Sequence, residues 1–567
     1  MTAPPATDDR ATPVTPWRGD RAALFGVVGA GVLFAALAAT VVGLDRAVRW
    51  DEVTYLAQVT PGQPDVWFGP QRARGMTIVL APVALVGAPT GLLRAWLILV
   101  HAVALIVAFR PWVPVAGPVA AAAAGVVAIG WVPLYFAVEG YPNLLAAFAC
   151  VAAAGYVLRW CRGRTPGGDT RTTAGVGGDA AVRPAADDRR SLIAAGLTIA
   201  VVAWLRPTES VWIAAALTPV VVLLARRDAW RMIVAFLIGG FVGWLPWLLE
   251  AIVRFGGPFG RLDAARATSA AGADRNSLIQ YLNLVEGPVR RVVADPVLTG
   301  PAALLLAGLA ALALLGVVVR SHQRVGVAAD RRIAAAVGLW AGLIMVVPYL
   351  VLNAGINLRY LLPGLLLGAV AVGGGLVVLV AAIARVPGRA VTVVLLVALV
   401  AGLIGVAGWQ AQLAATNSDD IAPLQARPVP LGEALAVAAD GEPCAFLSNV
   451  QWPEIQWHSG CLGEVLDPAE PLLQCPDARR DLAALAADGH RIFVLERGEP
   501  PFSPAVADWP VTRLDDPEDG VWRLYERPAE LGPDDAPTIP SGDPEVPCLP
   551  SRAPDTSQAT LDVRWRR

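Results

Sequence analysis

Long apolar runs recur along most of this chain and restrict it to one fold class. Ala22–Leu44, Leu92–Phe109 and Met232–Leu249 are examples, and about 20 apolar residues are enough for a helix to cross a bilayer. Charged residues make up 16% of the chain and hydrophobic residues 55%, whereas a soluble domain has about 25% charged residues. The sequence therefore predicts an α-helical polytopic membrane protein.

The distribution of arginines predicts which side of the membrane each loop occupies. Cytoplasmic connections carry an excess of basic residues. With the N-terminus inside, the apolar runs give about eleven crossings, and the stretch 75–89 is too short to cross and lies at the outer interface. The short inner connections then carry Arg110, Arg226, Arg227, Arg320, Arg331, Arg332, Arg385 and Arg389.

Shifts in composition divide the chain into four parts. Residues 1–20 and 527–567 are rich in Pro and Asp and lack the apolar residues for a core, so both are expected to be disordered, the first in the cytoplasm. Between them we expect a membrane domain over 21–409 and an extracytoplasmic α/β domain over 410–526. The membrane domain contains a first outer loop at 45–90, a disordered cytoplasmic loop at 160–190 and an outer loop at 251–299.

The expected α/β domain alternates short apolar strands with helical stretches. Strands are predicted at 444–449, 491–496 and 521–527. Helices are predicted near Leu431–Ala438, at 452–460 and near Arg480–Ala487.

Cysteine usage agrees with an oxidising environment for the C-terminal part. Cys444, Cys461, Cys475 and Cys548 all lie there, and four cysteines allow three complete pairings. Cys444 with Cys461 is the first choice, and unpaired thiols are the alternative. No Cys or His spacing suits a metal, so no metal site is expected. The net charge of −2 and pI of 6.2 give no reason to expect a nucleic-acid partner.

The first outer loop contains the densest group of reactive side chains. Residues 45–75 combine acids, arginines and aromatics around Trp50-Asp51-Glu52. A loop on the outer membrane face can meet both water-borne and lipid-borne substrates. A solvated acidic pair is the simpler interpretation, but ionisable groups beside aromatic residues at a membrane edge favour a functional site.

Other outward-facing polar residues are expected to join this loop in one site. Carboxylates can accept a proton from an attacking hydroxyl group, and guanidinium groups bind phosphate through paired hydrogen bonds. The alternatives are that the arginines anchor the helices at lipid headgroups and that Glu139 caps a helix or pairs with an arginine. The candidates are Asp51, Glu52, Arg72, Arg74, Glu139, Arg206, Glu209, Arg359 and Tyr360.

Four motifs in this order resemble a known superfamily. They are "WDEVTYLAQ" after the first helix, an acid at the second outer turn (Glu139), "LRPTES" at 205–210 and "NLRYLLPG" at 357–364. Together they look like the GT-C membrane glycosyltransferases, which include protein O-mannosyltransferases and the aminoarabinose transferases that modify lipid A. The segment "VQWPEIQWHSG" also resembles a part of their bacterial outer domains.

The resemblance implies a sugar transferase in the cell membrane that uses a polyprenyl-phosphate-linked donor and an extracytoplasmic glycan, lipid or protein acceptor. Inversion at the sugar is expected, with no cofactor. The implied catalytic residues are Asp51 as base, with Glu52 and Glu139 as further acids. The implied donor-phosphate ligands are Arg206, Arg359, Tyr360, Arg72 and Arg74, and the implied acceptor-side residues are Glu209, Trp457 and His458.

Two other classes of function remain open at this stage. A transporter or lipid flippase predicts charges near the bilayer midplane and matching halves, whereas the ionisable residues here gather at one surface. A noncatalytic membrane anchor for the outer domain would not need acids and arginines in several outer turns. Trp452 and Trp457 have a packing alternative as core residues of that domain.

Overall fold

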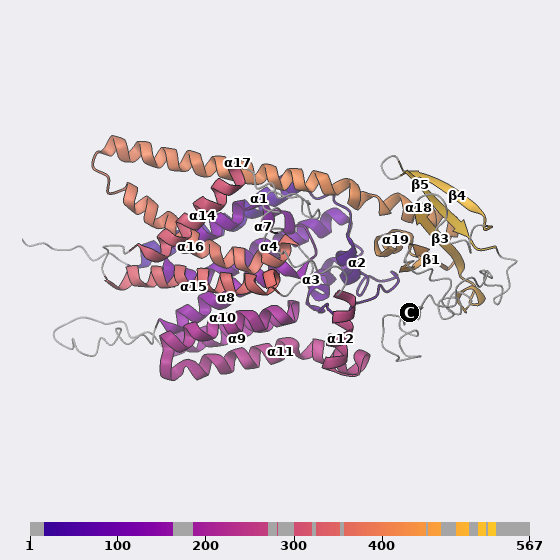
Figure 1. The fold of residues 1–567 in the computed structure, drawn as a ribbon, viewed down its shortest axis with the longest axis horizontal. Coiled ribbons are helices and arrows are strands. Elements are labelled where there is room, and N and C mark those ends of the chain that lie inside the picture. Colours follow the sequence, from indigo (N-terminus) through magenta and orange to yellow (C-terminus); the bar gives the residue numbers. More distant parts are fainter. Residues whose placement is uncertain are drawn as a thin grey trace, which may run out of the picture.

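The computed structural model describes residues 16–162, 185–269, 281, 300–319, 325–351, 357–448, 452–465, 484–497, 508–516 and 520–528. Within these ranges a long bundle of helices carries a smaller domain with a β-sheet at one end, here called the sheet end (Figure 1). The expected fold class is confirmed. Most of the two proposed tails and of the 160–190 loop, much of the 251–299 loop, and Arg320, Cys475 and Cys548 lie outside the described residues, whereas residues 16–20, expected to be disordered, are helical.

The helices follow the apolar runs closely. Their bounds are α1 Pro16–Leu37, α2 Trp50–Leu56, α3 Gly75–Ala84, α4 Thr90–Phe109, α5 Val113–Ala116, α6 Pro118–Ile129, α7 Trp131–Phe136, α8 Pro142–Cys161, α9 Ala185–Leu205, α10 Pro207–Ala225, α11 Ala229–Phe255, α12 Pro258–Ser269, α14 Gly300–Val318, α15 Val325–Val351, α16 Leu362–Ile383, α17 Arg389–Ala426, α18 Pro428–Ala439 and α19 Trp452–Ser459. Short helical turns are η1 Ala38–Val42, η2 Arg110–Trp112, η4 Arg226–Asp228 and η5 Leu358–Leu361.

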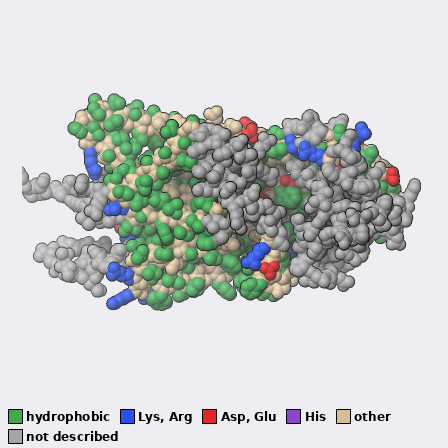
Figure 2. Space-filling model, in the orientation of Figure 1, with side chains coloured by type: hydrophobic (Ala, Val, Ile, Leu, Met, Phe, Trp, Pro, Cys, Tyr) green, Lys and Arg blue, Asp and Glu red, His purple; other side chains and the backbone are tan. Residues whose placement is uncertain are grey.

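The bundle has the length and surface of a multi-pass membrane protein. The described residues contain eight helical segments that are long and apolar enough to cross a bilayer, and one of them, Pro207–Phe255, contains both α10 and α11. Hydrophobic side chains cover most of the visible bundle surface, and basic side chains lie at the end away from the sheet as well as at the sheet end (Figure 2). The expected number of about eleven crossings stays a prediction.

Two segments differ from the sequence prediction. The apolar run Val113–Leu134, one of the predicted crossings, is not a single helix, because it is divided into α5, α6 and α7. The helix is interrupted at Gly117, whose φ is 59°, and again at Gly130. α17 extends past Trp409 to Ala426 without a break, so the expected domain boundary at residue 410 lies inside a helix (Figure 1).

The C-terminal domain contains a five-stranded mixed sheet with strand order β2-β1-β3-β5-β4. β1, β2 and β3 are parallel, whereas β5 is antiparallel to β3 and β4. The predicted strands correspond to β1, β3 and β5, and the sequence prediction missed the two edge strands β2 and β4. The bounds are β1 Cys444–Ser448, β2 Leu462–Val465, β3 Arg491–Arg497, β4 Val511–Asp516 and β5 Gly520–Glu526.

Both faces of the sheet are buried. Phe446 and Phe493 belong to the core that includes α18 and α19, whereas Ala445 and Ile492, their neighbours in the strands, belong to a separate core on the other face. Burial on both faces explains why β1 and β3 read as nearly continuous apolar runs. The predicted helices at 431–438 and 452–460 are α18 and α19, and residues 484–487 of the third are helical.

The disulfide chosen first from the sequence, Cys444 with Cys461, is present. It joins β1 to the residue that follows α19 by two positions. Cys150 and Cys161 are buried, and neither forms a disulfide with another described residue. The disulfide therefore fixes the end of α19 to the sheet.

The C-terminal domain and the first outer loop share one hydrophobic core. Leu431, Phe446 and Ile455 of the domain belong to the same buried cluster as Val53 and Phe68 of the loop. Burial of such side chains contributes about 1.5–3 kcal/mol each. The position of α2 in the loop is thus tied to the position of the domain.

Close contact between α9 and α11 depends on glycine. A Cβ added at Gly239 would lie 2.1 Å from the carbonyl oxygen of Gly196, and one at Gly243 would lie 2.2 Å from that of Ala200. The next residue, Gly240, has no atom within 4 Å of such a Cβ. Glycine thus allows α11, which carries Trp244, Trp247 and Glu250, to pack directly against α9.

Gly239→Ala is expected to destabilise the bundle, because its methyl group overlaps the α9 backbone. Overpacking of this kind costs about 1–3 kcal/mol, so the midpoint of thermal unfolding in detergent should fall. Gly240→Ala adds the same methyl group in open space and serves as the matched control. Equal unfolding midpoints for the two variants would contradict the close packing described here.

Candidate functional site

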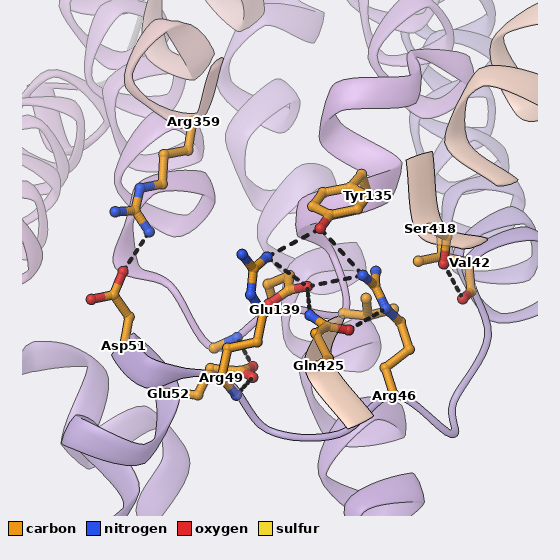
Figure 3. Close-up of polar contacts among 12 residues, drawn as sticks. Val42, Arg46, Arg49, Asp51, Glu52, Tyr135, Glu139, Arg359, Ser418 and Gln425 are labelled. Atoms are coloured by element: carbon orange, nitrogen blue, oxygen red, sulfur yellow. Dashed lines mark hydrogen bonds and ion pairs between the residues drawn. The ribbon is translucent and has the colours of Figure 1, made fainter. Parts of the chain in front are cut away.

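Asp51 lies between two arginines from distant parts of the chain. Its Oδ1 is 2.6 Å from Nη2 of Arg72, and its Oδ2 is 2.6 Å from Nη1 of Arg359. Asp51 is in the first turn of α2, Arg72 precedes α3, and Arg359 belongs to η5. Figure 3 shows the pair formed by Asp51 and Arg359. One carboxylate therefore joins three segments at the sheet end.

These groups line a cavity of about 410 Å³. Arg206 and Tyr360 line it as well, so five of the sequence candidates meet around one space. The remaining walls are mainly aromatic and apolar. They include Tyr55, Tyr141, Leu205, Trp244, Trp247, Leu262, Ala265 and Tyr349.

Arg206 is held at the junction of α9 and α10 by a polar cluster. Its Nε donates to Glu209 at 2.7 Å and its Nη2 donates to the Tyr349 hydroxyl at 3.0 Å, while that hydroxyl donates to Glu209 at 2.7 Å. The Tyr349 and Tyr360 rings stack with centroids 5.2 Å apart, and the Arg206 guanidinium lies 5.5 Å from the Tyr360 centroid. Glu209 is buried and therefore supports Arg206 rather than an acceptor.

A second cavity of about 230 Å³ lies against the same carboxylate. Asp51, Arg72, Tyr141 and Arg359 border both spaces. The smaller one is completed by Arg49, Trp50, Phe136 and Asn357. Asp51 thus stands in the wall between two chambers that can hold two different molecules.

Electrostatics keep Asp51 ionised. Burial alone would raise the pKa of its carboxyl, but the charges and hydrogen bonds of Arg72 and Arg359 hold that pKa well below its usual range. The Nε of Arg359 is buried and has no hydrogen-bond partner among the described residues. The site therefore has an ionised carboxylate and a guanidinium with unused hydrogen-bonding capacity.

Glu52, the neighbour of Asp51, does not face either cavity. Its carboxylate is fully buried and accepts hydrogen bonds from Nη1 and Nη2 of Arg94, from the backbone N–H of Arg49 at 2.9 Å and from that of Gly140 at 2.5 Å. Arg94 also donates to the carbonyl oxygens of Arg46, Ala47 and Val138. Since its oxygens are already used, Glu52 joins the first loop to α4 and to the 138–140 turn.

Glu139 is likewise buried and apart from the cavities. Its Oε1 lies 3.5 Å from Arg46 and 3.6 Å from Arg49, and Gln425 of α17 donates to it at 3.3 Å (Figure 3). Burial would raise the pKa of its carboxyl, but the nearby arginines lower it. Pairing with an arginine was the alternative to a catalytic role for Glu139, and the structure places Glu139 in such ion pairs.

Three other candidates also lie away from the main cavity. Arg74 donates to Glu250 of α11 at 2.8 Å and does not line the cavity that Arg72 lines. Trp457 lines a separate, mostly apolar cavity of about 290 Å³ between the first loop and the start of α4. His458, which follows it, lines none of these three cavities.

Sequence reasoning missed several supporting residues. Arg261 is fully buried and donates to the carbonyl oxygens of Pro70, Trp247 and Arg72 at 2.8–2.9 Å, which fixes the segment that carries Arg72. Arg94 had a signal in the sequence, because an arginine inside an apolar run is costly unless it is paired. Tyr349 had no such signal, since an aromatic residue in an apolar helix is ordinary core material.

The described residues contain no group of three or more His, Cys, Asp or Glu side chains placed to hold a metal ion. The expected absence of a metal site stays a prediction. The guanidinium groups that line the cavities suit the binding of an anion. The carboxylate of Asp51 can act as a proton acceptor.

Comparison with solved structures finds similar proteins at low sequence identity. ArnT from Cupriavidus metallidurans, bound to undecaprenyl phosphate, matches with a TM-score of 0.56 and 14% identity over 88% of this chain and 98% of that chain. Its apo structure matches with a TM-score of 0.55 over the same shares. The oligosaccharyltransferase AglB from Archaeoglobus fulgidus matches with a TM-score of 0.47 and 13% identity over 91% of this chain and 75% of that one.

No protein-family model and no curated protein matches the sequence. The match to ArnT extends over nearly the whole of both chains, so the two proteins share one overall fold. The expected GT-C-like fold is confirmed.

Glu52→Gln is expected to destabilise the protein far more than Asp51→Asn. Glu52 and Arg94 are both fully buried, and loss of one partner of a buried pair costs about 3–5 kcal/mol. The Asp51 side chain keeps 22% exposure, so water can partly compensate. Thermal unfolding of the two purified variants checks this, and a Glu52→Gln midpoint equal to that of Asp51→Asn would refute the assignment.

Proposed function

We propose that this chain is a membrane glycosyltransferase that moves a sugar from a polyprenyl-phosphate donor to an acceptor hydroxyl on the extracytoplasmic side. The observation that carries the proposal is the ionised Asp51 held between Arg72 and Arg359 in the wall of a cavity that Arg206 also lines. The lipid phosphate bound in ArnT, which has the same fold, supports the class of donor.

The arginines suit the donor phosphate. Guanidinium groups bind phosphate oxygens through short, charge-assisted hydrogen bonds, and Arg206 and Arg359 approach the cavity from different helices. The unpartnered Nε of Arg359 can be satisfied by such an oxygen. In this proposal Arg206, Arg359 and Tyr360 hold the phosphate, and Arg72 stands between the phosphate and Asp51.

The cavity walls suit the rest of the donor. Tyr349, Tyr360, Trp244 and Trp247 offer aromatic faces beside the arginines, and binding sites combine such apolar walls with a few placed polar groups. α9, α10 and α11 border the cavity through Leu205, Pro207 and Trp247. A polyprenyl chain can therefore remain among apolar helices while its phosphate reaches the arginines.

The proposed reaction is a single displacement with Asp51 as general base. The acceptor oxygen, in the smaller cavity, bonds to the anomeric carbon while its proton passes to the Asp51 carboxylate. The bond between that carbon and the phosphate oxygen breaks, and its electron pair stays on the phosphate. The arginines stabilise this leaving charge, and attack opposite to the leaving group inverts the sugar.

The ion pairs of Asp51 also connect donor binding to catalysis. A phosphate that draws Arg359 and Arg72 toward itself weakens their hold on the carboxylate, which becomes more basic as it loses cationic partners. Asp51 then accepts a proton more readily when the donor is bound. The low pKa that the two ion pairs impose on Asp51 is compatible with a base that acts only once the donor is bound.

The arginines on the apolar bundle support the proposed orientation. Arg226, Arg227, Arg385 and Arg389 are exposed in connections at the end away from the sheet (Figure 1), and arginines favour the cytoplasmic side. The C-terminal domain and both cavities are then extracytoplasmic. The disulfide between Cys444 and Cys461 agrees with this side.

Arg206→Gln and Arg359→Gln are each expected to weaken binding of undecaprenyl phosphate by about 10- to 100-fold, since hydrogen bonds to charged groups contribute about 1.5–3 kcal/mol. Titration of purified protein in detergent measures the dissociation constants. Arg231→Gln, on the exposed surface of α11, is the control and should bind as the wild type does. Unchanged affinity in both test variants would rule out the proposed phosphate site.

Asp51→Asn is expected to reduce transfer by about 10²- to 10⁴-fold, the usual contribution of a general base. Binding of undecaprenyl phosphate should be retained, because the substitution removes a negative charge beside the phosphate. A panel of radiolabelled polyprenyl-phosphate sugars, incubated with membranes that contain each protein, measures transfer. Wild-type transfer rates in Asp51→Asn would show that another group is the base.

A further inference from the structure

We infer that Glu454, in the C-terminal domain, is a positioning residue for Asp51, so that this domain is a working part of the reaction centre. The inference rests on the proposed role of Asp51. It follows from one hydrogen bond that joins residues 404 positions apart in the sequence.

The backbone N–H of Trp50 donates to Oε1 of Glu454 at 2.7 Å. Trp50 begins α2 and directly precedes Asp51. The Glu454 side chain is buried, with 7% of the residue exposed, and a carboxylate that accepts a backbone N–H away from water forms a strong bond. The domain thus holds the backbone at the residue next to the proposed base.

Further contacts of α19 keep the first loop in the same register. The rings of Trp452 and Trp50 meet edge to face with centroids 5.7 Å apart, and Nε2 of Gln456 donates to the carbonyl oxygen of Pro64 at 2.9 Å. Since Trp50 lines the smaller cavity, α19 also sets the position of one wall of that cavity.

α19 is itself firmly attached to the sheet. Cys461 is bonded to Cys444 of β1, and the backbone N–H of Gly463 in β2 donates to Oε1 of Gln456 at 2.9 Å. A movement of Glu454 therefore requires a movement of the domain. The position of α2, which carries the proposed base, is therefore set by a domain outside the bundle.

The contacts of the Asp51 carboxylate depend closely on the position of α2. The Oδ1 of Asp51 is 2.6 Å from Arg72, and its Oδ2 is 2.6 Å from Arg359. Catalytic groups must be held within about 0.5 Å of their working positions. At the other side of the α2 start, Glu52 accepts the N–H of Arg49 at 2.9 Å. One glutamate from the membrane domain and one from the C-terminal domain together fix this turn.

Amide hydrogen exchange of the full chain in nanodiscs tests the contact directly. Glu454→Ala should speed exchange in peptides covering 47–56 by about tenfold, the equivalent of one charge-assisted hydrogen bond. Glu454→Gln keeps an acceptor oxygen and should rescue most of this protection. Glu433→Ala removes an exposed acid of α18 and is the matched control. Unchanged exchange at 47–56 in Glu454→Ala would overturn the inference.

A second measurement separates positioning from simple anchoring of the domain. If Glu454 holds Asp51 against Arg72 and Arg359, Glu454→Ala should let the carboxylate compete less for these arginines and should tighten undecaprenyl phosphate binding about threefold. The same substitution in an Asp51→Asn background should have no effect. An equal effect in both backgrounds, or none in either, would mean that Glu454 anchors the domain only and would overturn the inference.

The two measurements also distinguish the inference from the function on which it rests. Failure of wild-type protein to bind undecaprenyl phosphate would refute the proposed donor, and the exchange experiment would still decide whether Glu454 holds α2. Binding by the wild type, with unchanged exchange in Glu454→Ala, would leave the proposed function intact and refute the inference alone.

Discussion

The site depends on the two ion pairs of Asp51. They join α2, the segment before α3 and η5, which are far apart in the sequence. Each arginine has its own support. The Arg72 backbone is held by the buried Arg261, and the backbone N–H of Arg359 donates to the Asn357 side chain at 3.1 Å. Because neither arginine is a free surface group, the carboxylate between them has a defined place, and both cavities take their shape from it.

The sequence predicted the membrane fold well because hydrophobic length is a local property. An apolar run of about 20 residues has few alternatives to a membrane helix. The same reasoning found the first loop, where charges follow directly on an apolar run, and it found Arg206 and Arg359, which lie at helix ends. It failed where the backbone changes direction inside an apolar stretch, as at Gly117 and Gly130, because hydropathy does not report the path of the chain.

Asp51 and Glu52 show why side-chain roles were harder to predict. Neighbours on a helix point in directions about 100° apart, so one carboxylate faces the cavities while the other meets Arg94. Which one faces the cavity depends on how α2 is rotated, and that rotation is fixed by partners hundreds of residues away. The role of Glu139 also depends on a distant partner, because Gln425 donates a hydrogen bond to it from α17, which continues beyond its expected end. No local pattern contains this information.

The arrangement of charges around the cavity also bears on its selectivity. Arg72 and Arg359 are already paired with Asp51, and Arg206 with Glu209. Chloride or orthophosphate therefore meets guanidinium groups whose charge is already balanced by a carboxylate, and its binding brings little net gain in free energy. A ligand whose apolar portion is buried as well gains the hydrophobic contribution that small ions lack. Ion pairing within the site thus disfavours the abundant inorganic anions relative to a ligand that is both anionic and apolar.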